Sequence, residues 1–247
     1  MPTYRGLSPE VTGGADLGSS SQRWDTLYTN NIDPGAQIPG AFNKKVTFTT
    51  SGTFVAPVTG VYRITLQGGG GGGAGAGTTS STHVTGGGGG QGGYGVFYEQ
   101  LIAGTSYSYV IGAGGSGGAA GGSSAAGAAG TAGGDTSIVI GINTYKAAGG
   151  ARGLGSANMG RGGYGGAFTI NSVNAISLAA PGTPGSATAT YATGGAGGGN
   201  GAVYYEGTGA YGGGGAGGAI YSDSTGYHDG SAGGDGFIQF EYYDATI

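Results

Sequence analysis

The chain has 247 residues, of which 67 are glycine and none is cysteine, and its formal net charge is −4 with only 8% charged residues. Scattered Lys and Arg argue against a nucleic-acid partner, and no apolar stretch approaches the ~20 residues that membrane insertion needs. The missing cysteines exclude disulfide and thiolate chemistry. The 7 prolines and irregular glycine spacing exclude collagen.

Residues 1–40 differ from the rest, because glycine is ordinary there and the apolar residues are few. Such a segment is too small to form a core of its own. We therefore expect it to pack against the rest of the chain or against copies of itself. The residues expected to make these contacts are Leu17, Arg23, Trp24, Leu27 and Tyr28.

Residues 41–247 contain short segments in which β-branched and aromatic residues alternate with polar ones, a pattern typical of strands. Residues 44–57 are predicted to form two strands with a turn at Ser51-Gly52, and residues 60–67 form another. Residues 95–112 read as strand, turn at Ala103-Gly104, and strand. Residues 136–150 look like a hairpin, and residues 236–243 form the closing strand. No segment has a helical period, so the predicted fold is all-β.

Long glycine blocks emerge from the strand ends, at 68–77, 86–95, 112–134, 149–166, 194–201, 212–218 and 230–236. A glycine run can adopt the polyproline II conformation, which has three residues per turn and no internal hydrogen bonds. Such runs become stable when they bond sideways to one another, and close packing then excludes side chains. We expect a β-sandwich with packed polyglycine II helices, whose inserts are loops displayed at the ends of these rods.

Four stretches resemble, in order, the glycine-rich domain at the ends of bacteriophage tail fibres: "FTTSGTFVAPVTGVYRITLQGGGGGG", "GGYGVFYEQLIAGTSYSYVIGAGGSGG", "GGDTSIVIGINTYKAAGGARG" and "GGAGGDGFIQFEYY". The first two look like that family's opening and central hairpins. The segment "DLGSSSQRWDTLYTNNI" is similar to a short stretch of trimeric tail-fibre shafts. The rods and inserts also resemble the tail-tip adhesins of T-even-like phages. The resemblance covers residues 46–243.

The resemblance implies a virion protein of the tail fibre that attaches to the host, built as a homotrimer. Residues 1–40 would form the shaft or join other tail proteins, and residues 41–247 would bind a host surface glycan or outer-surface protein. Aromatic rings bury area at low entropic cost and carry polar groups, which suits a recognition surface. The candidate receptor-binding residues are His83, Tyr191, Tyr204, Tyr205, Tyr211, Tyr221, Tyr227 and His228.

No motif predicts a cofactor or an enzyme. Glycine pairs that match a dinucleotide fingerprint arise by chance in this composition, and no helix follows them. His228 and its flanking Asp223 and Asp229 could bind a metal, but a polar loop explains them better by ligand count. No paired carboxylates or nucleophile–base arrangement is evident. The alternative function is a glycine-rich ice-binding or structural scaffold protein.

Overall fold

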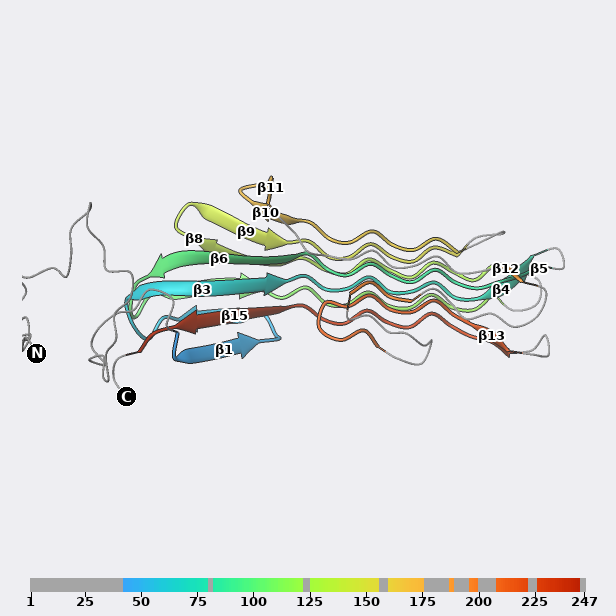
Figure 1. Cartoon of the computed structure of the whole chain (residues 1–247), viewed down its shortest axis with the longest axis horizontal. Coiled ribbons are helices and arrows are strands. Elements are labelled where there is room, and N and C mark those ends of the chain that lie inside the picture. The colour runs from blue at the N-terminus through green and yellow to red at the C-terminus, as the bar shows by residue number, and fades with distance from the viewer. Residues whose placement is uncertain are drawn as a thin grey trace, which may run out of the picture. The chain divides into compact units, whose positions relative to one another are not determined.

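The computed structural model describes residues 42–79, 82–121, 125–155, 160–175, 187–188, 196–199, 208–221 and 226–244. Within these residues the regular secondary structure consists of strands, which confirms the all-β prediction. Figure 1 shows the large strands grouped together and the glycine segments running side by side away from them. The expected shaft segment, residues 1–40, lies outside the described residues.

One antiparallel sheet has four strands in the order β1-β15-β3-β6. The closing strand therefore lies between the first strand and the third, with Phe240 opposite both Val46 and Ile64. This register places the first strand of residues 41–247 directly beside the last strand. The bounds are β1 (Lys44–Phe48), β3 (Gly60–Gln67), β6 (Tyr94–Leu101) and β15 (Phe237–Tyr242).

A second antiparallel sheet has six strands in the order β11-β10-β9-β8-β7-β2. Its last hairpin, β10–β11, turns through Asn171 and Ser172, which both have a positive φ. The sequence analysis predicted no strands in this stretch, so the β10–β11 hairpin is found only in the structure. The bounds are β2 (Gly52–Val55), β7 (Ser106–Val110), β8 (Thr136–Ile140), β9 (Asn143–Ala147), β10 (Phe168–Ile170) and β11 (Val173–Ala175).

Two of the expected hairpins are wrong, and one is confirmed. β1 and β2 belong to different sheets, and so do β6 and β7, so the turns near Ser51 and Gly104 cross from one sheet to the other. Alternation specifies which side chains face the core, but a strand shows the same alternation in either sheet. β8 and β9 do form the expected hairpin, with Gly141 at a φ of 61° in its turn.

The core between the two sheets is largely aromatic. Phe54 of the six-stranded sheet stacks on Phe240 of the four-stranded sheet, with ring centroids 4.1 Å apart. Phe97 and Tyr145 make a second contact across the sheets at 3.8 Å. Tyr62, Ile64 and Leu66 are fully buried, as their alternation predicted. Burial of these rings supplies the apolar stabilisation of the strand region.

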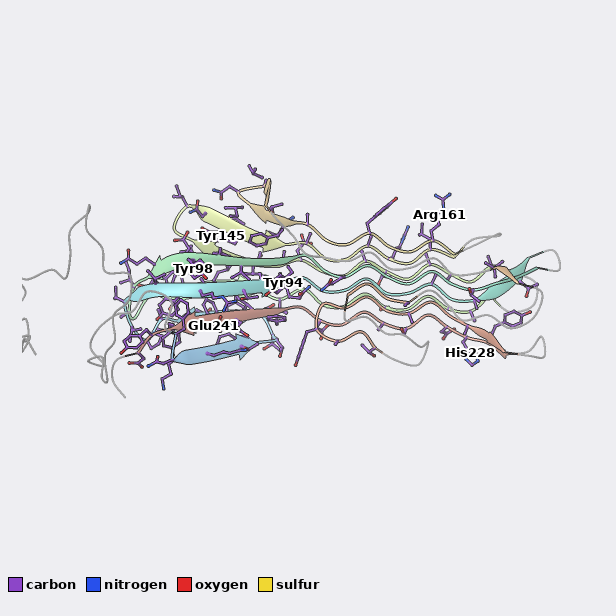
Figure 2. All side chains as sticks on the ribbon, in the orientation of Figure 1. Tyr94, Tyr98, Tyr145, Arg161, His228 and Glu241 are labelled. Atoms are coloured by element: carbon purple, nitrogen blue, oxygen red, sulfur yellow. The ribbon has the colours of Figure 1, made fainter. Side chains whose placement is uncertain are left out.

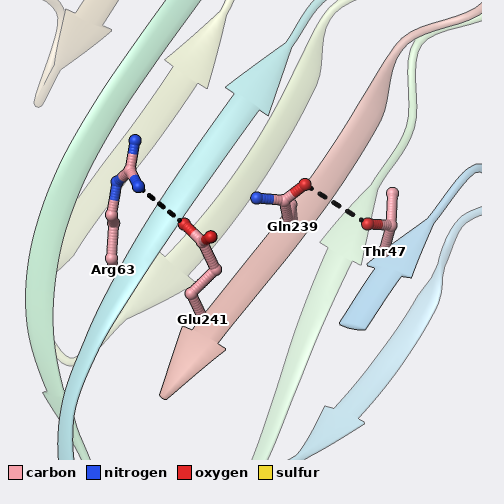
Figure 3. Close-up of polar contacts among 4 residues, drawn as sticks. All are labelled: Thr47, Arg63, Gln239 and Glu241. Atoms are coloured by element: carbon pink, nitrogen blue, oxygen red, sulfur yellow. Dashed lines mark hydrogen bonds and ion pairs between the residues drawn. The ribbon is translucent and has the colours of Figure 1, made fainter. Parts of the chain in front are cut away.

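The other face of the four-stranded sheet carries polar pairs (Figure 3). Arg63 and Glu241 lie opposite each other on β3 and β15, and their side chains form an ion pair at 3.1 Å. Thr47 donates a hydrogen bond to Gln239 at 3.4 Å between β1 and β15. The register places the members of each pair directly opposite each other. Cross-strand neighbours of opposite charge, or with hydrogen-bonding groups, stabilise a sheet.

Beyond the sheets, the glycine segments bond to one another sideways. Successive N–H groups of segment 68–77 donate to three neighbours in turn: Gly68 to Gly93, Gly69 to Gly134 and Gly70 to Gly234, each at 2.9 Å. Gly71, Gly72 and Gly73 repeat this order with the same three neighbours. A repeat of three residues is what a helix with three residues per turn produces.

Segment 68–77 lies at the centre of this arrangement. Its carbonyl groups accept hydrogen bonds from three further segments, through Gly115, Gly150 and Gly215. The six neighbours also bond to one another in a closed ring. In order around the centre they are 86–93, 148–155, 125–134, 112–121, 228–236 and 212–219. Three outer segments, 160–167, 196–199 and 208–210, bond to members of this ring. We call these ten segments the sheaf.

The close approach of the backbones excludes side chains from most of the interior of the sheaf, although the methyl groups of Ala74 and Ala76 in the central segment are fully buried. A Cβ atom added to Gly70 would overlap the carbonyl of Gly213, and one added to Gly71 would overlap the carbonyl of Ala151. The same overlap with a neighbouring backbone occurs at ring glycines such as Gly86, Gly115 and Gly214. Glycine is therefore required here because there is no room for a side chain, which accounts for the unbroken run from Gly68 to Gly73.

Candidate functional site

The end of the sheaf opposite the large sheets carries short strands formed by the inserts (Figure 1). β4 (Gly77–Thr79) continues the central segment, and β5 (Thr82–Val84) leads back to the neighbouring segment 86–93. β12 (Ala187–Thr188) pairs with β5, so two inserts distant in sequence meet in one small sheet. β13 (Ile220–Tyr221) and β14 (Gly226–Tyr227) form a separate hairpin.

Hydrogen bonds fasten this hairpin to the small sheet and to the sheaf. The hydroxyl groups of Thr78 and Tyr227 lie 2.5 Å apart. The backbone N–H of His228 donates to Ala219, and its carbonyl accepts from Ala76. The small sheet and the β13–β14 hairpin are therefore held together at this end of the sheaf. We call the strands β4, β5, β12, β13 and β14 together the tip.

The structure places four of the predicted binding residues at the tip. His83 lies in the middle strand of the small sheet, opposite Thr78 and Thr188. Tyr221 lies in β13, Tyr227 in β14, and His228 directly after it. Figure 2 labels His228 at this end of the glycine segments. Tyr227 and His228 are half-buried, so part of each side chain supports the tip.

Tyr211 lies elsewhere. Its ring is 60% exposed and contacts the edge of Phe237, the first residue of β15, at a centroid distance of 6.0 Å. It is therefore at the sheet end of the sheaf, apart from the tip residues. The remaining predicted residues lie outside the described part of the chain: Tyr191, Tyr204, Tyr205, Leu17, Arg23, Trp24, Leu27 and Tyr28.

Aspartate side chains occupy positions where the sheaf leaves an N–H group without a backbone partner. Asp235 accepts from Gly114 at 2.7 Å, Asp229 from Ala120 at 2.7 Å, and Asp135 from Gly149 at 2.9 Å. Asp229 and Asp235 are six residues apart, which is two repeats of the threefold pattern. The sequence reading missed this role, although that spacing was a usable signal.

The Asp229 carboxylate therefore accepts a structural hydrogen bond from Ala120. This weakens the hypothesis that Asp229 and His228 bind a metal ion. Among the described residues, no group of three or more His, Cys, Asp or Glu is arranged to hold a metal ion. The described part also contains no helix with the length and apolar character for crossing a bilayer.

A carboxylate paired with a tyrosine lies inside the strand region. Tyr145 donates to Glu99, and its pKa is raised to about 12, mainly by burial and also by the hydrogen bond and charge of Glu99. The tyrosine ring is covered by Phe97. A covered, neutral tyrosine is a packing element, so this pair offers no accessible acid or base.

A second group that the sequence reading did not single out lies on the side of the sheaf. Arg152, Arg161 and Tyr164 are exposed on the adjoining segments 148–155 and 160–167. Figure 2 shows Arg161 projecting outward from the glycine segments.

The chain was also compared with known proteins. No protein-family model and no curated protein matches it.

Proposed function

We propose that this chain is a bacteriophage tail-fibre adhesin that recognises a receptor on the host cell surface through the inserts at the tip. The observation that carries this proposal is the sheaf itself: ten laterally bonded segments, four of which continue into short strands made from the inserts. Its bonding repeat and its exclusion of side chains support the inference that the segments are polyglycine II helices.

In such a scaffold the sheaf provides rigidity, and the inserts at the tip bind the receptor. At the interior glycines such as Gly70 and Gly71, the backbone contacts leave no room for a side chain. The inserts at the tip are outside these contacts, so their sequence can change without disturbing the lattice. A surface loop on a rigid scaffold is the usual place for a binding residue.

The resemblance of residues 46–243 to tail-fibre glycine-rich domains adds to this proposal, together with the shaft-like pattern in residues 1–40. We propose that the latter mediates trimer formation or attachment to other virion proteins. Several copies on one particle would multiply weak contacts into strong adsorption. A light-scattering mass of three times the 23.4 kDa monomer would support the trimer; the monomer mass would contradict it.

The experiment that tests recognition exchanges the residues between the tip strands. Replacing residues 222–225 with a Gly/Ser linker of equal length keeps Tyr227 and its contact with Thr78. Binding of the labelled full-length chain to a panel of bacterial strains is then measured. We expect the strains that bind the natural chain to lose binding, whereas Val139→Ala, on the exposed face of the six-stranded sheet, leaves it unchanged. Unchanged binding after exchange of both 222–225 and 80–81 would contradict the proposal.

The ice-binding alternative is less well supported by the sheaf. An ice-binding face would be a flat outer face of the sheaf with Ala, Ser and Thr, but the side formed by segments 148–155 and 160–167 exposes Arg152, Arg161 and Tyr164. Thermal hysteresis of the purified chain distinguishes the two functions, and we expect none.

A further inference from the structure

The side of the sheaf built by segments 148–155 and 160–167 carries two arginines and a tyrosine, Arg152, Arg161 and Tyr164, which we call the arginine strip. The two segments are adjacent, because Ala151 donates to Tyr164 at 2.9 Å and Leu154 donates to Arg161 at 2.8 Å. Arg152 therefore lies, along the sheaf, between the levels of Tyr164 and Arg161. Three residues span roughly 9 Å in a helix of this kind, so the three residues occupy one short stretch.

All three side chains are directed away from the lattice. Arg152 and Arg161 are exposed, and Tyr164 is 82% exposed. Arg161 and Tyr164 are three residues apart, which places them on the same face of their segment. The interior of the sheaf needs none of them, because its contacts are made by backbone atoms.

The two guanidinium groups have no carboxylate partner among the described residues. Of the six described Lys and Arg residues, Arg63 pairs with Glu241 and Lys146 pairs with Asp135, and no ion pair involves Arg152 or Arg161. Asp135 accepts from Gly149, one three-residue step before Arg152, and is already paired with Lys146 at 3.1 Å.

These are also the only cationic side chains on the described segments of the sheaf. In a chain of net charge −4, they form a local positive site on a surface whose other charged groups are aspartates. A guanidinium presents a rigid fork of donors that matches the two oxygens of a phosphate or carboxylate group. A neighbouring exposed tyrosine adds a flat apolar face and a hydroxyl group.

We propose that the arginine strip binds an oxyanion group, phosphate or carboxylate, carried by a sugar of the host surface. This inference rests on the proposed adhesin function and adds a second contact along the side of the sheaf. Arg152 and Arg161 bind the charged oxygens, and Tyr164, on the far side of Arg152 from Arg161, packs against the adjoining sugar ring. The tip then selects the receptor, while the strip holds the neighbouring anionic glycan.

The test uses the full-length chain and three dextrans that share one backbone: dextran phosphate, carboxymethyl dextran and neutral dextran. Affinities are measured by biolayer interferometry at two salt concentrations. We expect binding to at least one charged dextran, none to neutral dextran, and weaker binding at higher salt. Preference for dextran phosphate or for carboxymethyl dextran identifies which oxyanion the strip takes.

The decisive variant is R152Q/R161Q, and its matched control is K44Q/K45Q, which removes the same charge from the four-stranded sheet. We expect R152Q/R161Q to weaken binding about tenfold, as the loss of two exposed charged contacts predicts. K44Q/K45Q should change binding less than twofold. Thermal melting of both variants establishes that they fold as the natural chain does.

Three outcomes would overturn the proposal: no binding of the natural chain to either charged dextran, no loss in R152Q/R161Q, or an equal loss in K44Q/K45Q. The last outcome would show that only net charge matters. The tip exchange of residues 222–225 separates this inference from the adhesin function. It should abolish cell binding and leave dextran binding unchanged, so that either proposal can fail without the other.

Discussion

In the strand region, Phe54, Phe97 and Phe240 fill the space between two sheets, whereas in the sheaf Gly70 and Gly71 leave no space to fill. The interior of each region is buried: Phe240 is fully buried in the core between the sheets, and residues 68–77 are buried at the centre of the sheaf. The first gains stability by removing apolar rings from water, and the second by pairing every successive N–H of its central segment with a neighbouring carbonyl. The two regions should therefore respond in opposite ways to the size of a side chain.

The largest effect is expected from adding one carbon atom to the centre of the sheaf. In Gly73→Ala the new Cβ would overlap the backbone of Ala216, which cannot move aside by changing a rotamer. We expect the free energy of unfolding to fall by about 5 kcal/mol or more, the range of the most damaging substitutions. Chemical denaturation measures this loss.

Gly60→Ala is the matched control, because nothing lies within 4 Å of the position that its Cβ would take. Its effect should be within about 0.5 kcal/mol. If Gly73→Ala were as mild as this control, the segments would not be packed as closely as described.

Removing a side chain from the strand region comes next in size. Phe240→Ala empties the centre of the core, where Phe240 stacks on Phe54 at 4.1 Å. The expected loss of unfolding free energy is about 3–5 kcal/mol. Val139→Ala, on the exposed outer face of the six-stranded sheet, should have little effect. Equal losses in both variants would mean that burial does not stabilise this region.

High pH should destabilise the strand region in a defined window. Burial is the main cause that raises the pKa of Tyr62 and of Tyr145 to about 12, above the ordinary value of 10.0. Above pH 10 the unfolded chain loses these protons while the folded chain keeps them, so unfolding becomes more favourable. Stability is therefore complete below pH 10 and declines toward pH 12.

Unfolding by denaturant at several pH values measures this decline. In Tyr62→Phe one of the two titrating groups is absent, and the profile should be flatter between pH 10 and 12. An unchanged slope in this variant would show that Tyr62 ionises as readily in the folded chain as in the unfolded chain.

The smallest effect is expected at the margin of the sheaf. Asp235→Ala removes the carboxylate that accepts from the N–H of Gly114 at 2.7 Å. We expect a loss of about 1 kcal/mol, as for other single hydrogen bonds of this kind. Asp235→Asn retains an acceptor oxygen and should lose less. A larger loss in Asn than in Ala would contradict the hydrogen-bonding role.

The sequence allowed the strands and their inward faces to be predicted, because alternation in segments such as residues 60–67 and 237–242 is a local signal. It did not determine which strands pair. β15 lies between β1 and β3, and β6 and β7 lie in different sheets, because these choices depend on contacts between residues distant in the chain. The turn residues Ala103 and Gly104 are as compatible with a connection between two sheets as with a hairpin within one sheet.

Glycine blocks predicted lateral packing but not its arrangement. The block at 112–134 forms two segments of the ring, and the block around 149–166 forms one ring segment and one outer segment, because each block reverses direction within itself. The tip was predicted from the aromatic inserts, whereas the arginine strip was missed. Arg152 and Arg161 are nine residues apart and come together only through hydrogen bonds between their segments.

Amide hydrogen exchange tests the lateral bonding of the sheaf most directly. The N–H groups of residues 68–76 donate to neighbouring carbonyls at 2.9–3.0 Å. They should exchange as slowly as those of β3 and β15, and Gly73→Ala should accelerate their exchange before it affects the strands. If residues 68–76 in the natural chain exchange at the rate of an unstructured peptide, the sheaf does not exist in solution, and a rigid display of the tip is contradicted.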